Sequence, residues 1–281
     1  MYALKQPHTL PDPVPEGIHV STALRNAGFA MLDSHCHNQV EVFHVETGSC
    51  RFLLDEEIYD LHAGDFLLIP PMKLHYTRYL FGTCRRTALY FSPTDADDAV
   101  LDLLPDGRSF LEKVRVFQIP EGHMEQVHDC LGRILKESRM RDSYSPPMQR
   151  LCLQELLLLF GRLATFLGDA PLDIHTTDQQ IIRAARFISD SYMHPITSRD
   201  VANAVGFSPN YLSRKFHEAA GIGLHEYLVF IRLHHAALEL RSTRDSITTI
   251  AFRCGFSDSN YFKDAFKKKY GVTPSYYRKY A

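Results

Sequence analysis

Three histidines and one glutamate have residue types and spacings that could form one site. His35, His37 and Glu41 lie at odd-numbered positions of one stretch, and because side chains alternate along a strand, they share one face. His75 follows about forty residues later, in a second apolar run. Three imidazoles and a carboxylate can together ligate a transition metal.

Three kinds of site fit these residues. A metal-dependent enzyme, or a metal held for structure or sensing, would use His35, His37, Glu41 and His75 as ligands. A pocket without a metal would use their polar atoms to hydrogen-bond a small polar effector. We expect the metal-free pocket, which needs no cofactor; its effector-binding residues are His35, His37, Glu41, His75, Tyr76 and Arg78.

The segment from about Gly28 to Phe91 is predicted to position these residues as β structure. Apolar and polar residues alternate there, and turn residues such as Gly48 and Gly64 separate short runs. Several short strands at this spacing are typical of a small barrel or jelly roll.

Two helical stretches follow. Apolar residues from Met124 to Ile134 recur at helical intervals, and a second stretch, roughly Met148 to Leu167, is apolar over most of its circumference. A helix with so little polar surface must be buried on several sides, within its domain or between subunits. We favour a subunit interface, hence a homodimer. Gly168–Asp173 is the predicted linker, since glycine and proline end the helix there.

The last hundred residues contain one pattern twice. Val201-Ala202 and, three residues later, Gly206-Phe207-Ser208 recur as Ile250-Ala251 and Gly255-Phe256-Ser257, offset by 49 residues; the residues after the turn recur at an offset of 50. Each copy predicts helix, tight turn, helix, with Ser208 and Ser257 capping the second helices. This is the layout in which the second helix enters the major groove of DNA.

The outer faces of these second helices carry polar side chains that could contact DNA. They are Asn210, Ser213, Arg214 and Lys215 in the first copy, and Ser259, Asn260, Lys263, Asp264 and Lys267 in the second. Asp264 is a departure, because an acid can accept from a cytosine amino group but repels phosphate. The DNA-contacting helix of the second copy therefore differs from that of the first copy in how strongly it binds DNA or in which bases it contacts.

The segment between the two copies and the distribution of charge both favour DNA. A connecting helix of about 18 residues is about 27 Å long, and successive major-groove faces lie about 34–36 Å apart. One rigid connecting helix can thus present the second helices of both copies to one side of a duplex. Residues 176–281 contain 15 Lys and Arg against 9 Asp and Glu, a net +6, which leaves 16 against 24, or −8, for the first 175.

The overall composition indicates an ordinary two-domain globular protein. It has 281 residues, 45% apolar and 23% charged. The six cysteines show no zinc-ligand spacing, as expected of reduced thiols. No signal peptide is evident, and the apolar run from Leu151 to Leu167 is interrupted by polar residues and is short for a bilayer span. We therefore expect a cytoplasmic protein without membrane contact.

The motifs of the C-terminal repeat resemble those of the AraC/XylS family over about the last hundred residues. They are Ala202-x3-Gly206-Phe207-Ser208, Gly221-x5-Tyr227, Arg232-Leu233-x2-Ala236, Ile250-Ala251-x3-Gly255-Phe256, Phe262-x3-Phe266-Lys267 and Gly271-x-Thr273-Pro274-x2-Tyr277-Arg278. The resemblance implies two helix-turn-helix subdomains joined by a long helix and acting on transcription, with operator or promoter DNA and RNA polymerase as partners.

The N-terminal spacings resemble the two cupin motifs over about Gly28 to Tyr79. Gly28 lies one residue too far from His35, Met72 stands where the second motif has glycine, and Tyr79 stands where it has asparagine. Members of the AraC/XylS family with a cupin-like N-terminal domain commonly sense sugars, so the resemblance favours a carbohydrate effector.

The predicted fold is thus α+β and multidomain. It comprises a cupin-like β-barrel for effector sensing (1–122), a helical dimerisation segment (123–168), a linker (169–176) and an all-α double helix-turn-helix DNA-binding domain (177–281). The predicted function is sequence-specific DNA binding by a transcriptional activator that responds to a small polar effector such as a sugar, and not enzymatic catalysis. The alternatives are a metal-responsive regulator using the His/Glu site and a metal-dependent cupin enzyme; the basic repeat argues against the enzyme.

Overall fold

The structure, a computed structural model, describes residues 17–27, 29, 37–54, 57–79, 81–140, 142–166 and 176–280. The chain divides into two compact units, Met1–Asp173 and Ile174–Ala281, each considered by itself below. His35, Gly28 and the predicted linker Gly168–Asp173 lie outside the described residues. No helix in the described part of the chain is both long and apolar enough to cross a membrane.

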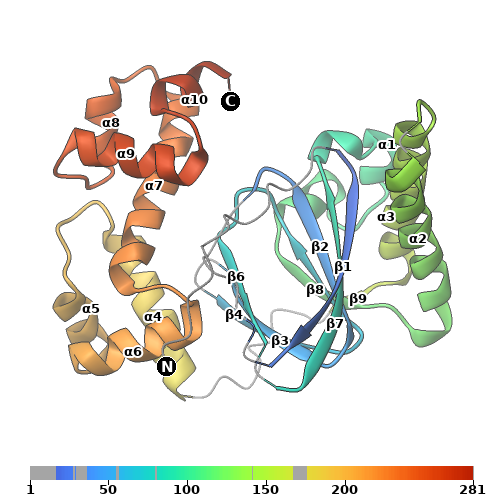
Figure 1. Cartoon of the computed structure of the whole chain (residues 1–281), viewed down its shortest axis with the longest axis horizontal. Coiled ribbons are helices and arrows are strands. Elements are labelled where there is room, and N and C mark those ends of the chain that lie inside the picture. Colours follow the sequence, from blue (N-terminus) through green and yellow to red (C-terminus); the bar gives the residue numbers. More distant parts are fainter. Residues whose placement is uncertain are drawn as a thin grey trace, which may run out of the picture. The chain divides into compact units, whose positions relative to one another are not determined.

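Two antiparallel sheets form the N-terminal unit (Figure 1). The six-stranded sheet has the order β1-β7-β2-β5-β8-β9, and the three-stranded sheet the order β4-β3-β6. The strands are β1 (His19–Asn26), β2 (Val40–Thr47), β3 (Ser49–Leu54), β4 (Glu57–His62), β5 (Asp65–Ile69), β6 (His75–Arg78), β7 (Thr83–Phe91), β8 (Arg115–Gln118) and β9 (Thr165–Phe166). The β structure therefore begins before Gly28 and continues beyond Phe91, the limits predicted from the sequence.

Strand β2 separates two hydrophobic cores. Val40 and Val42 point to one side and pack with residues of the helices, whereas Phe43 and Val45 point to the other side and pack against the small sheet. This follows from the two-residue alternation of a strand that is buried on both faces. A β-rich N-terminal unit followed by an all-helical one confirms the predicted fold class.

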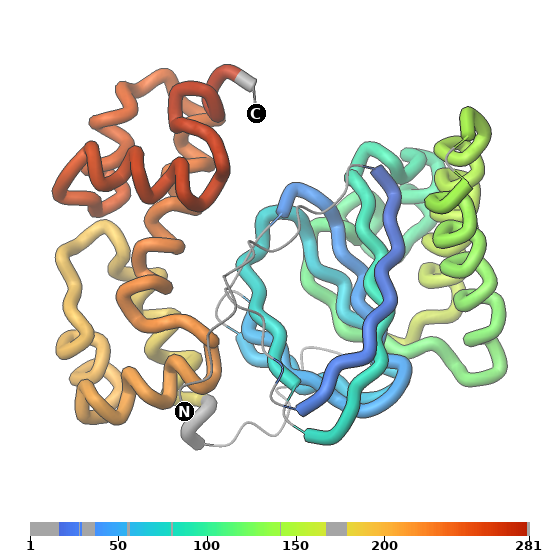
Figure 2. The backbone as a smooth tube through the Cα atoms, viewed as in Figure 1, coloured from blue at the N-terminus to red at the C-terminus, as the bar shows by residue number. Residues whose placement is uncertain are grey.

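Two long helices, α2 (Met124–Met140) and α3 (Ser145–Leu163), cover the outer face of the six-stranded sheet (Figure 2). The predicted limits of the second helix, Met148 and Leu167, were wrong at both ends. Proline is tolerated in a first turn, so α3 already begins at Ser145. It ends before Thr165 and Phe166, which pair with β8 as β9. The shorter elements are η1 (Pro93–Asp95), α1 (Asp98–Leu101), η2 (Gly107–Glu112) and η3 (Glu121–His123).

The C-terminal unit is helical. Its elements are α4 (Thr176–Ser191), α5 (Ser198–Val205), α6 (Pro209–Ala220), α7 (Leu224–Ser242), α8 (Ile247–Arg253), α9 (Ser259–Tyr270) and α10 (Pro274–Tyr280). Helix α7 runs from the α5–α6 pair to the α8–α9 pair (Figure 1). Its 19 residues correspond to about 28 Å. Its second half shares a core with α8 and α9, with Leu233 and Leu240 on its side and Phe262 and Phe266 on theirs.

The two tight turns differ by one residue. In the first, Gly206 ends α5 with φ of 73°, and the Ser208 side chain caps α6, as predicted. In the second, Gly255 has φ of 85°, but Asp258 caps α9, accepting from the backbone N–H groups of Asn260 and Tyr261. The predicted Ser257 cap was wrong, because the residue that changes the offset from 49 to 50 is inserted in the turn, ahead of the cap.

Candidate functional site

Helix α6 presents three of its four predicted DNA-contacting side chains to solvent. Asn210, Ser213 and Arg214 are exposed, while Leu212 and Phe216 are buried on the opposite face. The Arg214 guanidinium lies 5.5 Å from the ring centre of Tyr211, which gives this long side chain a fixed neighbour. Lys215 is only half-exposed, and its Nζ lies 3.0 Å from Glu218, so its charge is partly neutralised.

Helix α9 presents a corresponding face. Asn260, Lys263, Asp264 and Lys267 are exposed, and Ser259, at the first position of the helix, is half-buried. The three lysines that close the helix are not equivalent. Lys269 places its Nζ 4.1 Å from the ring centre of Phe230 in α7, whereas Lys267 and Lys268 are exposed. Exposed lysines and asparagines on one helix face suit contacts with phosphates and base edges.

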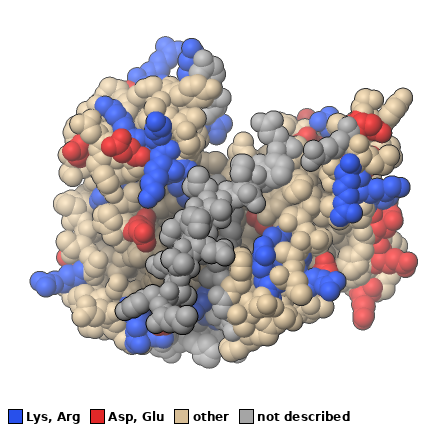
Figure 3. All heavy atoms as spheres, viewed as in Figure 1, with Lys and Arg blue, Asp and Glu red and all other residues tan. Residues whose placement is uncertain are grey.

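The 50-residue offset aligns the two faces residue by residue and identifies one position that sequence reasoning missed. Ser213 corresponds to Lys263, Arg214 to Asp264, and the exposed His217 to Lys267. The offset itself was sufficient to find His217. In the view of Figure 3, basic side chains gather over the part of this unit that contains α9 and α10.

A second cluster lies between the two sheets of the N-terminal unit. The Nε2 atoms of His37 and His75 each lie 3.2 Å from Oε2 of Glu41, and the Tyr90 hydroxyl donates to Oε1 of Glu41 at 3.0 Å. Strand β2 supplies Glu41, β6 supplies His75, and β7 supplies Tyr90. Burial alone would raise the pKa of Glu41, but the hydrogen bonds from His37 and His75 hold that pKa well below its ordinary value.

Both histidines are oriented by the backbone. Nδ1 of His37 lies 2.9 Å from the carbonyl oxygen of Gln39, and Nδ1 of His75 lies 3.0 Å from that of Lys73. A carbonyl oxygen can only accept, so each Nδ1 carries the proton. In a metal site each Nε2 would instead direct its lone pair at the ion, as in a histidine ligand whose other nitrogen is held by a carbonyl.

The structure separates two of the predicted effector-binding residues from this cluster. Side chains alternate along β6, so Tyr76 and Arg78 point to the opposite face from His75. The expectation that they lie near the histidines was wrong, because it rested on proximity in the chain rather than on strand alternation. Tyr90 takes part instead; its pairing with Glu41 across β2 and β7 has no signal in the sequence.

Comparison with known proteins matches each unit separately. Residues 21–157 match the family model of the AraC-like ligand binding domain, and residues 201–280 match that of a helix-turn-helix domain. The HTH-type transcriptional activator RhaS of Enterobacter sp. (strain 638) is 23% identical over 247 residues, 87% of each chain.

Two further relatives match a smaller share of the chain. The uncharacterised HTH-type transcriptional regulator YijO of Escherichia coli (strain K12) is 32% identical over 158 residues, 56% of each chain. The solved C-terminal domain of AraT, a response regulator from Geobacillus stearothermophilus, is 34% identical with a TM-score of 0.36, covering 39% of this chain and 89% of that one.

Proposed function

The chain belongs to the AraC family of DNA-binding transcriptional regulators, with a ligand-binding domain ahead of its helix-turn-helix domain, and from that premise we propose that it activates transcription by placing α6 and α9 in successive major grooves of its operator. The family consists of regulators of transcription rather than enzymes. As an activator, the protein would have RNA polymerase as a further partner. A protein that binds an operator and RNA polymerase acts in the cytoplasm.

One observation carries this proposal: the chain contains two complete helix-turn-helix units joined by one helix. Each has a buried core on one face of its second helix and exposed polar side chains on the other. The net charge of +6 on this unit supplies the phosphate attraction on which DNA affinity depends.

The test is to sequence the DNA fragments that the full-length protein retains, with and without candidate sugars. We expect one enriched motif with two half-sites about one helical turn apart, and retention that falls steeply with salt. Arg214→Ala should reduce retention, while the matched control Arg139→Ala, at an exposed arginine of α2, should not. If the protein retained no DNA at low salt, the proposal would be contradicted.

We place the effector, a small polar molecule such as a sugar, against the buried cluster of His37, Glu41 and His75, with His35 as a further contact. The carboxylate and imidazoles offer acceptors and donors that suit hydroxyl groups. Glu41→Ala should abolish the response to the effector and spare DNA binding. Induction that survives this substitution would contradict the assignment.

A second candidate is a regulator that responds to a metal. One ligand atom each from His37, Glu41 and His75 lies within 4.8 Å of the others, and both histidines have their Nδ1 atoms held by carbonyls. Three such ligands suit zinc or another divalent transition metal, which would lock the two sheets together. Elemental analysis and thermal unfolding with and without chelator test this; stoichiometric metal in the wild type but not in His75→Asn would favour it.

We propose that α3 forms a homodimer with a second copy. Met148, Leu151 and Leu158 are 43%, 65% and 38% exposed and follow one another at intervals of three and seven residues, so they form one apolar stripe. A stripe of this kind on a helix whose other face is packed against the sheet suits a helix of the same kind in a partner subunit.

A further inference from the structure

A pocket of about 210 Å³ opens between the six-stranded sheet and helix α2, away from the buried His37, Glu41 and His75 cluster. It is lined by Val20, Thr22, Glu46, Thr87, His128, Leu131, Gly132 and Leu135. Glu41 and Glu46 both belong to β2, but Glu41 lies between the two sheets, whereas Glu46 faces the helix. The pocket is therefore a separate site, on the opposite side of the same strand.

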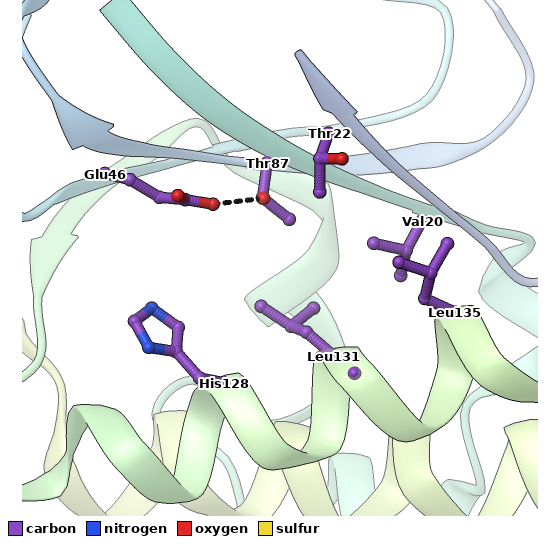
Figure 4. A pocket seen from close by; sticks show the side chains of 8 residues that line it. Val20, Thr22, Glu46, Thr87, His128, Leu131 and Leu135 are labelled. Atoms are coloured by element: carbon purple, nitrogen blue, oxygen red, sulfur yellow. Dashed lines mark hydrogen bonds between the residues drawn. The ribbon is translucent and has the colours of Figure 1, made fainter. Parts of the chain in front are cut away.

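The pocket has a polar end and an apolar end (Figure 4). Glu46, Thr87 and His128 gather at one end, while Val20 and Leu135 form the other. The Thr87 hydroxyl donates to Oε1 of Glu46 at 2.5 Å, and Thr22 is the direct cross-strand partner of Thr87. The ligand that fits is one with a polar head and a short apolar body.

The charge of the polar end selects the head group. Glu46 supplies a carboxylate that is half-buried, and none of the described residues that line the pocket is a lysine or an arginine. Removing a carboxylate from water is costly unless a positive charge compensates it. Hydroxyl groups beside it add acceptors for N–H donors.

Gly132 keeps the pocket open. It stands inside α2, where glycine is less favourable than alanine because of its backbone freedom. A Cβ built on Gly132 would meet no atom within 4 Å, so packing does not require the glycine. A larger side chain here would instead extend into the space that the pocket occupies.

We propose that this pocket binds a small organic ammonium ion, with its charged head against Glu46 and its alkyl body between Val20, Leu131 and Leu135. A volume of about 210 Å³ lies below that of sites for drug-sized ligands, so a ligand of a few heavy atoms fits. The site requires no property of the proposed DNA interface or of the buried cluster.

A ligand in this pocket would affect how α2 and α3 pack on the sheet. The ligand would bridge β1, β2 and β7 to α2, and α2 packs against α3, which carries the exposed apolar stripe. A bound ammonium ion would therefore favour one position of the helical pair on the sheet.

The test uses n-butylammonium as the probe, with n-butanol and butyrate as neutral and anionic controls, in ligand-observed NMR titrations of the full-length protein. A five-heavy-atom ligand in a site of this kind should bind with a Kd of about 1–10 mM. We expect n-butylammonium to bind at least about tenfold more tightly than n-butanol, and butyrate to bind least, because one ion pair decides the difference.

Two variants locate the binding. Glu46→Gln removes the charge but retains an acceptor for Thr87, and should reduce n-butylammonium affinity to that of n-butanol. Gly132→Leu fills the space and should abolish binding of both, while leaving the helix at least as stable. The matched controls Glu112→Gln and Gly122→Leu, at exposed positions outside the pocket, should bind like the wild type.

Any of three results would overturn the proposal. The first is equal affinity for n-butylammonium and n-butanol, and the second is undiminished binding to either pocket variant. The third is no binding of n-butylammonium up to 50 mM, about five times the weakest expected Kd. DNA retention, measured on the same variants, is expected to persist in Glu46→Gln. Loss of ammonium binding with intact DNA binding, or the reverse, thus distinguishes this proposal from the proposed function.

Discussion

The Nε atom of Arg232 donates a hydrogen bond to the carbonyl oxygen of Tyr192 at 2.8 Å. Its Nη2 atom donates to the carbonyl of His194 at 2.9 Å, so the connecting helix α7 holds the chain that leaves α4. Gly255, in the turn of the second helix-turn-helix unit, lies against the same atoms. This contact connects the end of α4 to the turn that positions α9.

Gly255→Ala should therefore destabilise the C-terminal unit more than Gly206→Ala does. Both glycines have a positive φ, which costs alanine about 1–2 kcal/mol. A Cβ on Gly255 would also lie 2.4 Å from the Tyr192 carbonyl oxygen and 2.8 Å from Arg232 Nε, whereas one on Gly206 meets nothing within 4 Å. We expect an additional cost of about 2 kcal/mol, typical of overpacking, in urea unfolding; equal effects would contradict the contact.

Arg214 and Asp264 occupy equivalent positions of α6 and α9, and their substitutions should have opposite effects. Arg214→Ala should weaken operator binding by about 1–3 kcal/mol. Asp264→Asn removes a negative charge from the side of α9 that is proposed to face DNA, and should tighten binding to random-sequence DNA a few-fold at low salt. Fluorescence anisotropy against salt concentration measures both. Tighter binding by Arg214→Ala, or weaker non-specific binding by Asp264→Asn, would refute the proposed faces.

Leu151→Glu should dissociate the dimer proposed at α3. Leu151 is the most exposed member of the stripe, and burying it in an interface would contribute about 1.5–3 kcal/mol. Light scattering should show monomers at concentrations where the wild type is dimeric. Leu103→Glu is the matched control, because Leu103 is an exposed leucine of the same unit that lies outside α3. A dimer that resists Leu151→Glu would move the interface elsewhere.

Acid should destabilise the N-terminal unit below about pH 6.5, because burial lowers the pKa of His44 to about 4. The unfolded chain binds the proton near pH 6.5, so between these values it holds more protons than the folded state. The free energy of unfolding thus falls with falling pH through this window, by up to about 3 kcal/mol, and levels off below it.

His44→Phe removes this titration and retains the stacking on Phe66, whose ring centre lies 4.0 Å away. The dependence of stability on pH between 4 and 6.5 should become shallower. Glu41 acts in the same direction at lower pH, since its pKa is also depressed in the fold.

Met72→Gly should stabilise the turn that follows β5. Met72 has φ of 64°, and its backbone N–H donates to the His37 carbonyl at 2.7 Å, beside the buried cluster. Relief of about 1–2 kcal/mol of left-handed strain exceeds the greater chain entropy of glycine, about 0.4–1 kcal/mol. Thermal unfolding should show a gain of up to about 1 kcal/mol. Gly64→Ala, where φ is 94° and space is open, should show a loss.

Local signals predicted the helical half well and the β half in part. Capping residues, turn glycines and helical periodicity depend on neighbours in the chain, so α5, α6 and α8 could be placed from the sequence. The cap of α9 was misplaced because Ser257 and Asp258 are both good caps, and the sequence alone does not choose between them. Strand alternation grouped His37 with Glu41 in the sequence, but His37 lies ahead of β2 and reaches Glu41 from the segment before the strand.

Contacts between distant segments could not be predicted in this way. The pairing of Tyr90 with Glu41 depends on the register of β7 on β2, which the strand sequences do not encode separately. The pocket at Glu46 requires β1, β2, β7 and α2 to meet, and only the fold brings Thr22 and His128 to the same place. Gly132 gave a weak indication, as a glycine inside a helical pattern.

Strand β2 carries Glu41 on one face and Glu46 on the other, and its backbone is common to both sites. A ligand that shifts this strand toward one sheet or helix changes the geometry offered to the other ligand. The two occupancies must then obey thermodynamic reciprocity: the factor by which an ammonium ion alters affinity at the buried cluster equals the factor by which the second ligand alters affinity for the ammonium ion. A regulator built on such a strand would respond to each small molecule with an affinity that depends on the concentration of the other.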